Sequence, residues 1–204
     1  MLYLTDKEAI LVAMPNPRDM LITLPNPHLR QSSKRVGVIT KDVQKTITDM
    51  EAAVIDWEDS RQHEVGVALA AVQIDDLYKI VIVRNDYDNK EDKTFKVFIN
   101  PSITKFEGEP VADFEGCLSI QDIYGKVPRY PKIRVKAVGI DGKPFRITAE
   151  GFLARVLQHE IDHTNGIVFI DRIKGVNDVF YKLNEDGNLE QLDDKKVHNS
   201  RILW

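Results

Sequence analysis

The chain has 204 residues, 43% of them hydrophobic and 29% charged, which is enough for one globular domain with a sizeable core. Its formal net charge is −4 and it has no long basic run, so the sequence gives little support to unspecific nucleic-acid binding. No apolar run approaches the ~20 residues that span a bilayer, the N-terminus lacks the plan of a signal peptide, and a single cysteine excludes an internal disulfide, which together predict a cytoplasmic protein.

The first half of the chain is expected to form an irregular arm, a long helix and two strands. Residues 1–39 contain four prolines and no clear period, which favours an arm with one short strand near residues 21–24. Thr40 is a suitable N-cap, and the apolar residues from Val43 to Trp57 recur every three or four positions, which predicts an amphipathic helix to about Ser60. Strands are predicted at 80–83 and 95–99, the second ending at Asn100-Pro101.

The second half is expected to place a buried helix between two hairpins. Residues 132–140 and 145–149 alternate in polarity on either side of Asp141-Gly142, which predicts an antiparallel hairpin. The helix that follows Gly151 is apolar nearly all round and should end at Asn165-Gly166. A strand is expected at 167–170, a last hairpin over 180–192, and a solvated tail. The predicted fold is α+β, with antiparallel β-sheets packed around a central helix, in one domain over 1–204 that ends in an uncertain extension over 173–204.

The predicted central helix contains His159-Glu160-x-x-His163. Residues four apart share one helix face, so the two histidines can bind one metal ion, and Glu160 lies ~100° away, within reach of a water beside that ion. Phe152 and Val156 fall on the face of the histidines. The alternative is that two histidines are simply buried and hydrogen-bonded, but two imidazoles and a carboxylate in an apolar helix need partners, and a metal with its water would satisfy all three.

Two further stretches contain residues suited to such a site. Cys117, in Glu-Gly-Cys-Leu-Ser, would add a thiolate to the two histidines and leave one coordination position open, as in catalytic metal sites; the alternative is a free buried cysteine. Gln73 ends the small-residue run Gly-Val-Ala-Leu-Ala-Ala-Val-Gln, which permits close backbone approach. Its amide could serve the structure or donate to a substrate, and composition alone does not choose between the two roles.

Together, and in this order, the stretches 66–73, 115–119 and 158–163 resemble the three signatures of the peptide deformylases. The second, Glu-Gly-Cys-Leu-Ser, and the third, Gln-His-Glu-x-Asp-His, match without a change. The first departs only at Ala68, where the family has the second Gly of Gly-x-Gly-Leu-Ala-Ala-x-Gln. Weaker resemblance extends from Pro25 to about Arg172. Three further positions, Val72, Gln121 and Thr164, also differ from the common residues, and all these departures concern substrate fit rather than the proposed ligands.

The resemblance implies a hydrolase that removes the N-formyl group from the formyl-methionine of new polypeptides and releases formate. It implies one divalent metal, natively Fe²⁺ with Zn²⁺ or Ni²⁺ as substitutes, held by Cys117, His159 and His163. Glu160 would be the general base and then the general acid, while the Leu118 N–H and the Gln73 amide would hold the oxyanion. The implied partners are formyl-methionyl nascent chains and, transiently, the ribosome; no membrane partner and no direct nucleic-acid site are implied.

Candidate substrate contacts and supporting residues are taken mainly from their positions beside these motifs. The expected substrate-binding residues are Gly66, Val67, Ala68, Gly116, Arg129, Phe152 and Val156. The expected supports of the metal ligands are Gln158, Asp162 and Glu115, of which the last could pair with Arg129 or with Arg155.

Two other functions remain open on the sequence alone. A zinc endopeptidase could be built on His-Glu-x-x-His, although Cys117 is not the usual third ligand of such enzymes. A catalytically weak deformylase-like protein that only binds peptides would also be compatible with Ala68.

Overall fold

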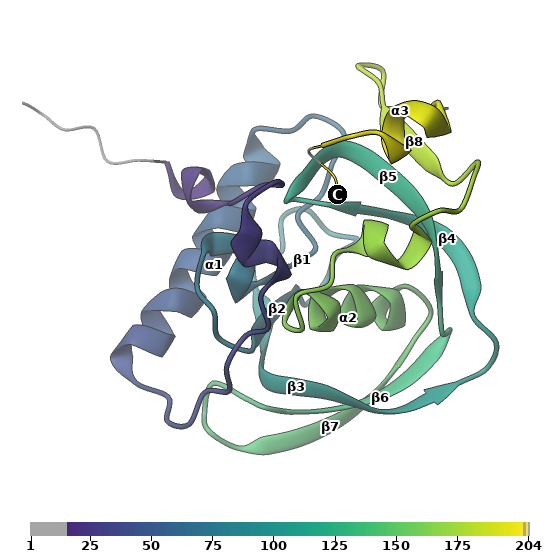
Figure 1. Ribbon diagram of the computed structural model, residues 1–204. Coiled ribbons are helices and arrows are strands. Elements are labelled where there is room, and N and C mark those ends of the chain that lie inside the picture. The colour runs from purple at the N-terminus through teal and green to yellow at the C-terminus, as the bar shows by residue number, and fades with distance from the viewer. Residues whose placement is uncertain (1–15, 202, 204) are drawn as a thin grey trace, which may run out of the picture.

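The computed structural model describes residues 16–201 and residue 203, so residues 1–15 of the predicted N-terminal arm lie outside the described part (Figure 1). Two antiparallel sheets enclose one helix. The first sheet has the strand order β1-β2-β3-β6-β7 and consists of β1 (Ala68–Ala70), β2 (Ile80–Arg84), β3 (Phe95–Glu107), β6 (Lys132–Val138) and β7 (Pro144–Glu150). The second has the order β4-β5-β8-β9 and consists of β4 (Val111–Cys117), β5 (Ile120–Arg129), β8 (Phe180–Leu183) and β9 (Leu189–Gln191).

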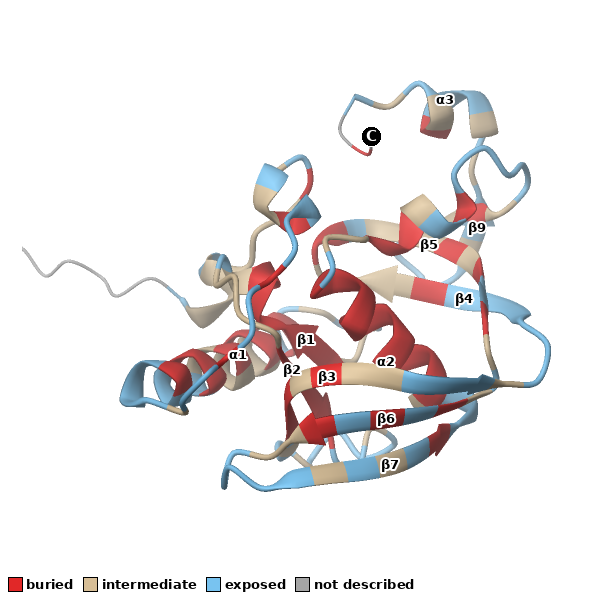
Figure 2. Ribbon diagram, turned by 60° about the horizontal axis from the view of Figure 1, so that its bottom comes forward, coloured by how far each residue is buried: buried red, intermediate tan, exposed pale blue. Residues whose placement is uncertain are grey.

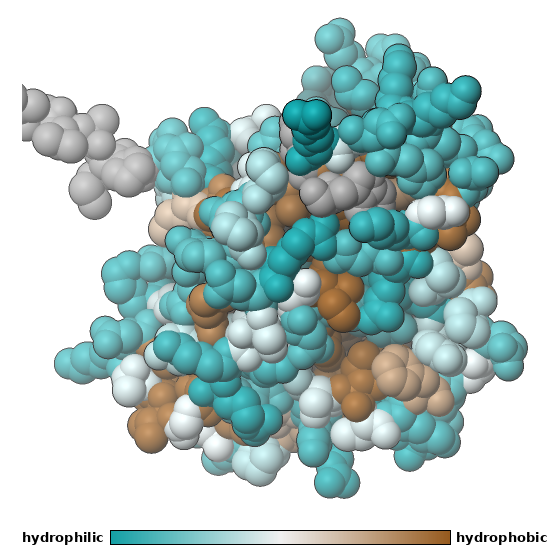
Figure 3. Space-filling model, in the orientation of Figure 1, coloured by the Kyte–Doolittle hydropathy of each residue, from teal (hydrophilic) through white to brown (hydrophobic). Residues whose placement is uncertain are grey.

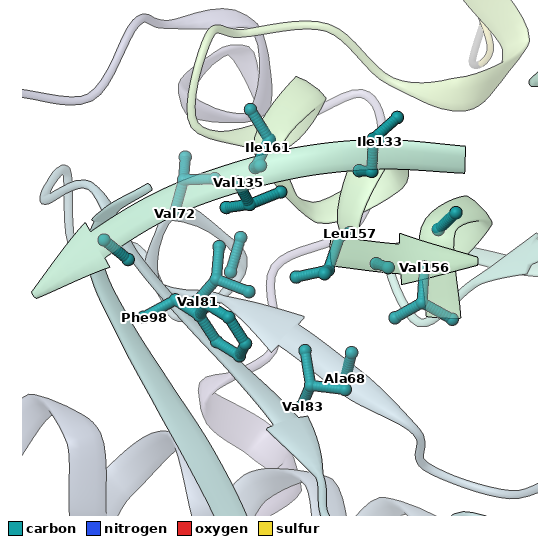
Figure 4. Close-up of a cluster of buried hydrophobic side chains, with 14 residues drawn as sticks. Ala68, Val72, Val81, Val83, Phe98, Ile133, Val135, Val156, Leu157 and Ile161 are labelled. Carbon is teal, nitrogen blue, oxygen red and sulfur yellow. The ribbon is translucent and has the colours of Figure 1, made fainter. Parts of the chain in front are cut away.

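Helix α2 (Gly151–His163) lies at the centre, and every residue from Ala154 to His163 is buried (Figure 2). Its apolar side packs on the first sheet, where Leu157 and Ile161 meet side chains such as Val81, Phe98 and Val135 (Figure 4). The predicted α+β fold around a buried helix that carries His-Glu-x-x-His is therefore confirmed.

Helix α1 (Lys41–Asp59) covers the other face of the same sheet. Thr40 caps it, because its hydroxyl accepts a hydrogen bond from the Val43 N–H over 3.3 Å, as predicted. Its buried stripe packs on alternate strand residues such as Ile80 and Ile82, whereas their neighbours face α2. Strand β2 is thus covered on both faces, which explains why its sequence is continuously apolar.

Several predicted elements are confirmed and three are corrected. The hairpin β6–β7, strand β2 and the last hairpin β8–β9 lie where they were expected. Strand β3, however, continues through Asn100-Pro101, because a register shift between Ile99 and Ser102 absorbs the proline and Asn100 takes a positive φ of 53°. Residues 21–24 form no strand, and the strand expected at 167–170 is a 3-10 helix at Phe169–Ile173.

The C-terminal segment also differs from the predicted solvated tail. A short helix, α3 (Asp194–His198), follows β9, and its charged residues face outward, but Val197 is buried. Val197 and Leu203 join a third hydrophobic cluster with Leu24, Leu29 and Phe169. The segment around Leu24 and Leu29 and the C-terminal segment therefore pack against the second sheet. Two shorter 3-10 helices, Pro17–Met20 and Pro27–Arg30, lie in the N-terminal part, and a third, Ala71–Ile74, follows β1.

The surface seen in the view of Figure 1 is largely hydrophilic, with apolar side chains in small separate groups (Figure 3). Among the described residues, no helix combines the length and the apolar character needed to cross a membrane.

Candidate functional site

Cys117, His159 and His163 meet at one point. Cys117 ends β4, and α2 presents both imidazoles from consecutive turns, as the four-residue spacing predicts. The Cys117 Sγ lies 3.2 Å from the His163 Nε2, and the two Nε2 atoms are 3.2 Å apart. All three donor atoms lie within 4.8 Å of one another. Ligands at about 2.0–2.3 Å from a tetrahedral divalent metal have mutual separations of this order, so the donor set fits one ion and leaves one position open.

Glu160 follows His159 on α2 and borders a cavity beside the three donor atoms. Its carboxylate has an incomplete set of hydrogen bonds. Its side chain is buried, yet no described residue gives its Oε2 atom a hydrogen bond. Burial raises the pKa of Glu160 to about 7; the nearby Glu115 adds to the rise, while His159 and Arg129 oppose it. A carboxylate whose pKa lies near neutrality is suited to exchange protons with a reacting group.

Glu115, on β4, connects His159, a predicted metal ligand, to the second sheet. One of its oxygens lies 3.0 Å from the His159 Nδ1, which leaves the Nε2 of that ring to face the other donors. Arg129 donates to both oxygens over 2.9 and 3.0 Å, and Arg155 donates over 2.8 Å. The sequence did not decide whether Arg129 or Arg155 pairs with Glu115, and in the structure both arginines donate hydrogen bonds to it. Burial alone would raise the pKa of Glu115, but the hydrogen bonds from His159 and Arg129 outweigh it and lower the pKa to about 2.

The other two predicted supports lie one step further from the donors. Asp162 accepts hydrogen bonds from Arg129 and Arg172, so it holds the arginine that holds Glu115. The Gln158 amide donates to the Tyr130 C=O over 2.8 Å and accepts from its N–H over 3.1 Å, which ties α2 to the end of β5. Both residues line a different cavity, on the far side of α2.

Gln73 and Leu118 flank Cys117. The Gln73 Nε2 lies 3.5 Å from the Cys117 Sγ and 3.2 Å from the Ser119 Oγ, and its Oε1 accepts from the Ala70 N–H over 2.9 Å. The amide therefore supports the local structure and also faces the cysteine. Both Gln73 and Leu118 border the cavity that contains Glu160.

This cavity has a volume of about 280 Å³. Most of the predicted substrate-binding residues line it: Val67, Ala68, Gly116, Phe152 and Val156. Phe152 is 49% exposed and stands at the rim, where Tyr87 packs against it at a ring distance of 5.0 Å. Other residues that line the cavity were not predicted from the sequence. They include Tyr124, whose hydroxyl donates to Glu64 over 2.8 Å.

Two predicted substrate-binding residues are placed elsewhere. Arg129 is 4% exposed and engaged with Glu115 and Asp162, so its charge is already neutralised in the interior. The Gly66 N–H donates to the Glu58 Oε2 over 2.8 Å, and a Cβ on Gly66 would come within 2.5 Å of Val54. Gly66 is therefore turned towards α1, and neither residue borders the cavity.

Sequence reasoning also missed Glu58, although one signal pointed to it. Glu58 follows Val54 by four positions and so continues the buried stripe of α1. Its carboxylate is 4% exposed and binds Arg84 over 2.8 Å and Lys93 over 2.9 Å, besides the Gly66 N–H. A charged residue on an apolar stripe indicates a buried ion pair, and this one fixes the start of the segment that leads into β1.

Comparison with known proteins agrees with this geometry. The family model described as polypeptide deformylase matches residues 19–178. The chain belongs to the polypeptide deformylase family. The peptide deformylase of Thermomicrobium roseum is 40% identical over 169 residues, which covers 81% of this chain and 92% of that protein. The peptide deformylase of Agrobacterium fabrum is 41% identical over 153 residues, 75% of this chain and 85% of the relative.

Solved structures of deformylases share the fold. The crystal structure of a peptide deformylase from Legionella pneumophila has a TM-score of 0.68 at 37% identity and covers 76% of this chain and 86% of that one. The structure of a peptide deformylase from Synechococcus elongatus in complex with actinonin has a TM-score of 0.69 at 33% identity, over 76% and 80% of the two chains. The chain is therefore an enzyme of the metal-dependent deformylase family, a hydrolase of protein biosynthesis, rather than an endopeptidase.

Proposed function

We propose that Cys117, His159 and His163 hold one divalent metal ion, Fe²⁺ in the native enzyme with Zn²⁺ or Ni²⁺ as substitutes. The three clustered donor atoms support this assignment, together with the Glu115 carboxylate that orients His159. When bound, such an ion acidifies water and polarises a carbonyl oxygen. Glu160 is adjacent and has a free carboxylate oxygen, which is the single observation that carries the proposed chemistry.

Glu160 acts as the general base. It takes a proton from the water that attacks the formyl carbon, and it then gives this proton to the nitrogen as the C–N bond breaks. The products are formate and a free amino terminus, so water is the only co-reactant. The pKa of about 7 supports this role, because the same group must accept and release a proton near neutral pH.

The developing oxyanion is held by the backbone N–H of Leu118 and the Nε2 of Gln73. Their positions on either side of Cys117 support the assignment, since both border the cavity beside the three donor atoms. Loss of one donor of this kind typically costs about 10²–10³ in rate.

The substrate is the formyl-methionyl end of a new polypeptide, met in the cytoplasm and, transiently, at the ribosome. Within the described part of the chain, strand β1 pairs with β2 alone, which leaves its other edge, beside Val67 and Ala68, free to pair with an extended peptide. Phe152 and Val156 supply apolar walls for the methionine side chain. Backbone pairing gives affinity that does not depend on the downstream sequence.

The test is release of formate from formyl-Met-Ala-Ser by enzyme loaded with Fe²⁺ without air, with acetyl-Met-Ala-Ser as the control. We expect turnover of the formyl peptide alone. Equal hydrolysis of the acetyl peptide would contradict a formyl-specific site, and absence of turnover with one equivalent of metal bound would favour a peptide-binding protein.

A further inference from the structure

A second groove lies away from the active-site cavity and carries three cations from separate parts of the sequence. Arg35 precedes α1, Lys136 lies on β6 and Arg146 lies on β7, and these three side chains line the groove with Asn100. We call it the basic groove. In Figure 1 the segment before α1 passes close to the turn between β6 and β7. No carboxylate belongs to its lining.

The three cations of the basic groove have no ion-pair partner among the described residues, unlike the other cations of the same hairpin. Lys132 pairs with Glu150 across β6 and β7 over 2.8 Å, and Arg134 pairs with Glu107 over 3.0 Å. Lys136, in contrast, is directly opposite Arg146 in the strand register, and both are exposed. Like charges placed opposite each other destabilise a sheet, so this arrangement lowers stability unless an anion lies between them.

The backbone that carries the cations of the basic groove is held in place by the sheet and by side-chain hydrogen bonds. Lys136 alternates with the buried residues Val135 and Ala137, which face α2, so Lys136 projects from the opposite face of the sheet. The backbone beside Arg35 is held by the Asn100 side chain, which accepts from the Val36 N–H and donates to the Val36 C=O, both over 2.9 Å. Cations fixed in this way lose little backbone freedom when they bind a ligand.

We propose that the basic groove binds the phosphate backbone of RNA. Two guanidinium groups and one ammonium group, without a carboxylate in the described lining, suit successive phosphates, and arginine matches phosphate geometry in a bidentate manner. The groove is an exception on a chain whose formal net charge is −4. The choice of RNA over DNA rests on the proposed function, because new polypeptides emerge from a ribosome built largely of RNA. Sequence inspection found no nucleic-acid site because residues 35, 136 and 146 are far apart in the chain.

The test is fluorescence anisotropy with a labelled 20-base-pair RNA duplex and the full chain, at 50 and 200 mM monovalent salt. Three phosphate contacts should make the affinity fall about 40-fold over this fourfold change in salt. The triple variant Arg35→Ala, Lys136→Ala, Arg146→Ala should bind at least about tenfold more weakly at 50 mM salt. The matched control is Lys182→Ala, Lys195→Ala, Lys196→Ala, which removes the same formal charge at exposed positions elsewhere and should stay within about twofold of the wild type.

Equal losses in the two triple variants would overturn the proposal, since binding would then reflect net charge alone. Displacement of the RNA by polyglutamate at equal charge concentration would assign the groove to an acidic polypeptide instead, and tighter binding of a DNA duplex of the same length would overturn the choice of RNA. Hydrolysis of formyl-Met-Ala-Ser should be unchanged in both variants, because the basic groove shares no residue with the catalytic cavity. If the wild type hydrolyses no formyl peptide, the proposed function fails while the RNA measurement still decides on the groove.

Discussion

Replacement of Glu115 by Gln should destabilise the metal-free protein at neutral pH by about 3 kcal/mol. The pKa of Glu115 falls from its ordinary value of 4.5 to about 2 in the folded protein. Each pKa unit corresponds to about 1.4 kcal/mol of preferential stabilisation of the ionised carboxylate. The fall from 4.5 to about 2 therefore corresponds to a loss of about 3 kcal/mol when the carboxylate is removed. Removal of one partner from a buried ion pair commonly costs about 3–5 kcal/mol, which agrees with the destabilisation derived from the pKa of Glu115.

The pH dependence of this effect has a definite sign. Because the folded-state pKa is depressed, the stabilisation is fully present above pH 4.5 and is lost as the pH falls towards 2. Urea unfolding of the wild type and of Glu115→Gln, both with a chelator, should therefore show a gap at pH 7 that narrows at pH 3.5. Glu107→Gln is the matched control, since Glu107 also pairs with two cations but lies at the surface, and its midpoint should not change. Equal midpoints for Glu115→Gln and wild type at pH 7, or a gap that does not narrow in acid, would refute the reasoning.

Three further predictions concern the active site. Cys117→Ser should bind Fe²⁺ or Zn²⁺ more weakly, measured by competition with a chromogenic chelator, and unchanged affinity would remove Cys117 from the ligand set. Ala68→Gly should lower KM for formyl-Met-Ala-Ser if the methyl group that borders the cavity crowds the peptide, whereas an unchanged kcat/KM would show that this departure from the family is neutral. The rate should fall in acid with a slope of one in a plot of log kcat against pH, because the base form of Glu160 is required and burial raises the pKa of this carboxyl to about 7 in the metal-free protein; a profile flat down to pH 5 would contradict its role as the base.

The sequence was most informative where one periodicity determined the environment of a residue. The spacing of His159 and His163 predicts both rings on one side of α2, and the apolar stripe of α1 predicts its buried face. Cys117 was a candidate third ligand from its chemistry, but only the family resemblance favoured it over a free buried cysteine, because it is 42 positions before His159 and no local pattern brings them together. The same limit left open which of the two arginines, Arg129 or Arg155, pairs with Glu115, since those contacts depend on how β5 and α2 pack beside β4.

Errors arose where tertiary packing overrode a local signal. Asn100-Pro101 usually ends a strand, yet a β-bulge lets β3 continue and the Asn100 side chain then ties down the arm. Arg129 was a predicted substrate-binding residue, and the structure places it in the interior beside two carboxylates, away from the lining of the cavity. Val197 and Leu203 carried too little periodicity to reveal that the tail is packed.

The measurement that tests the central claim most directly is metal content and formate release in the same samples of wild type and Glu160→Gln. The account predicts one equivalent of metal in both proteins, turnover of formyl-Met-Ala-Ser by the wild type, and a loss of at least about 10²-fold in kcat for the variant, because the metal ligands remain and the proton acceptor is removed. Substantial turnover by metal-loaded Glu160→Gln, or equal turnover by wild type stripped of metal, would contradict it.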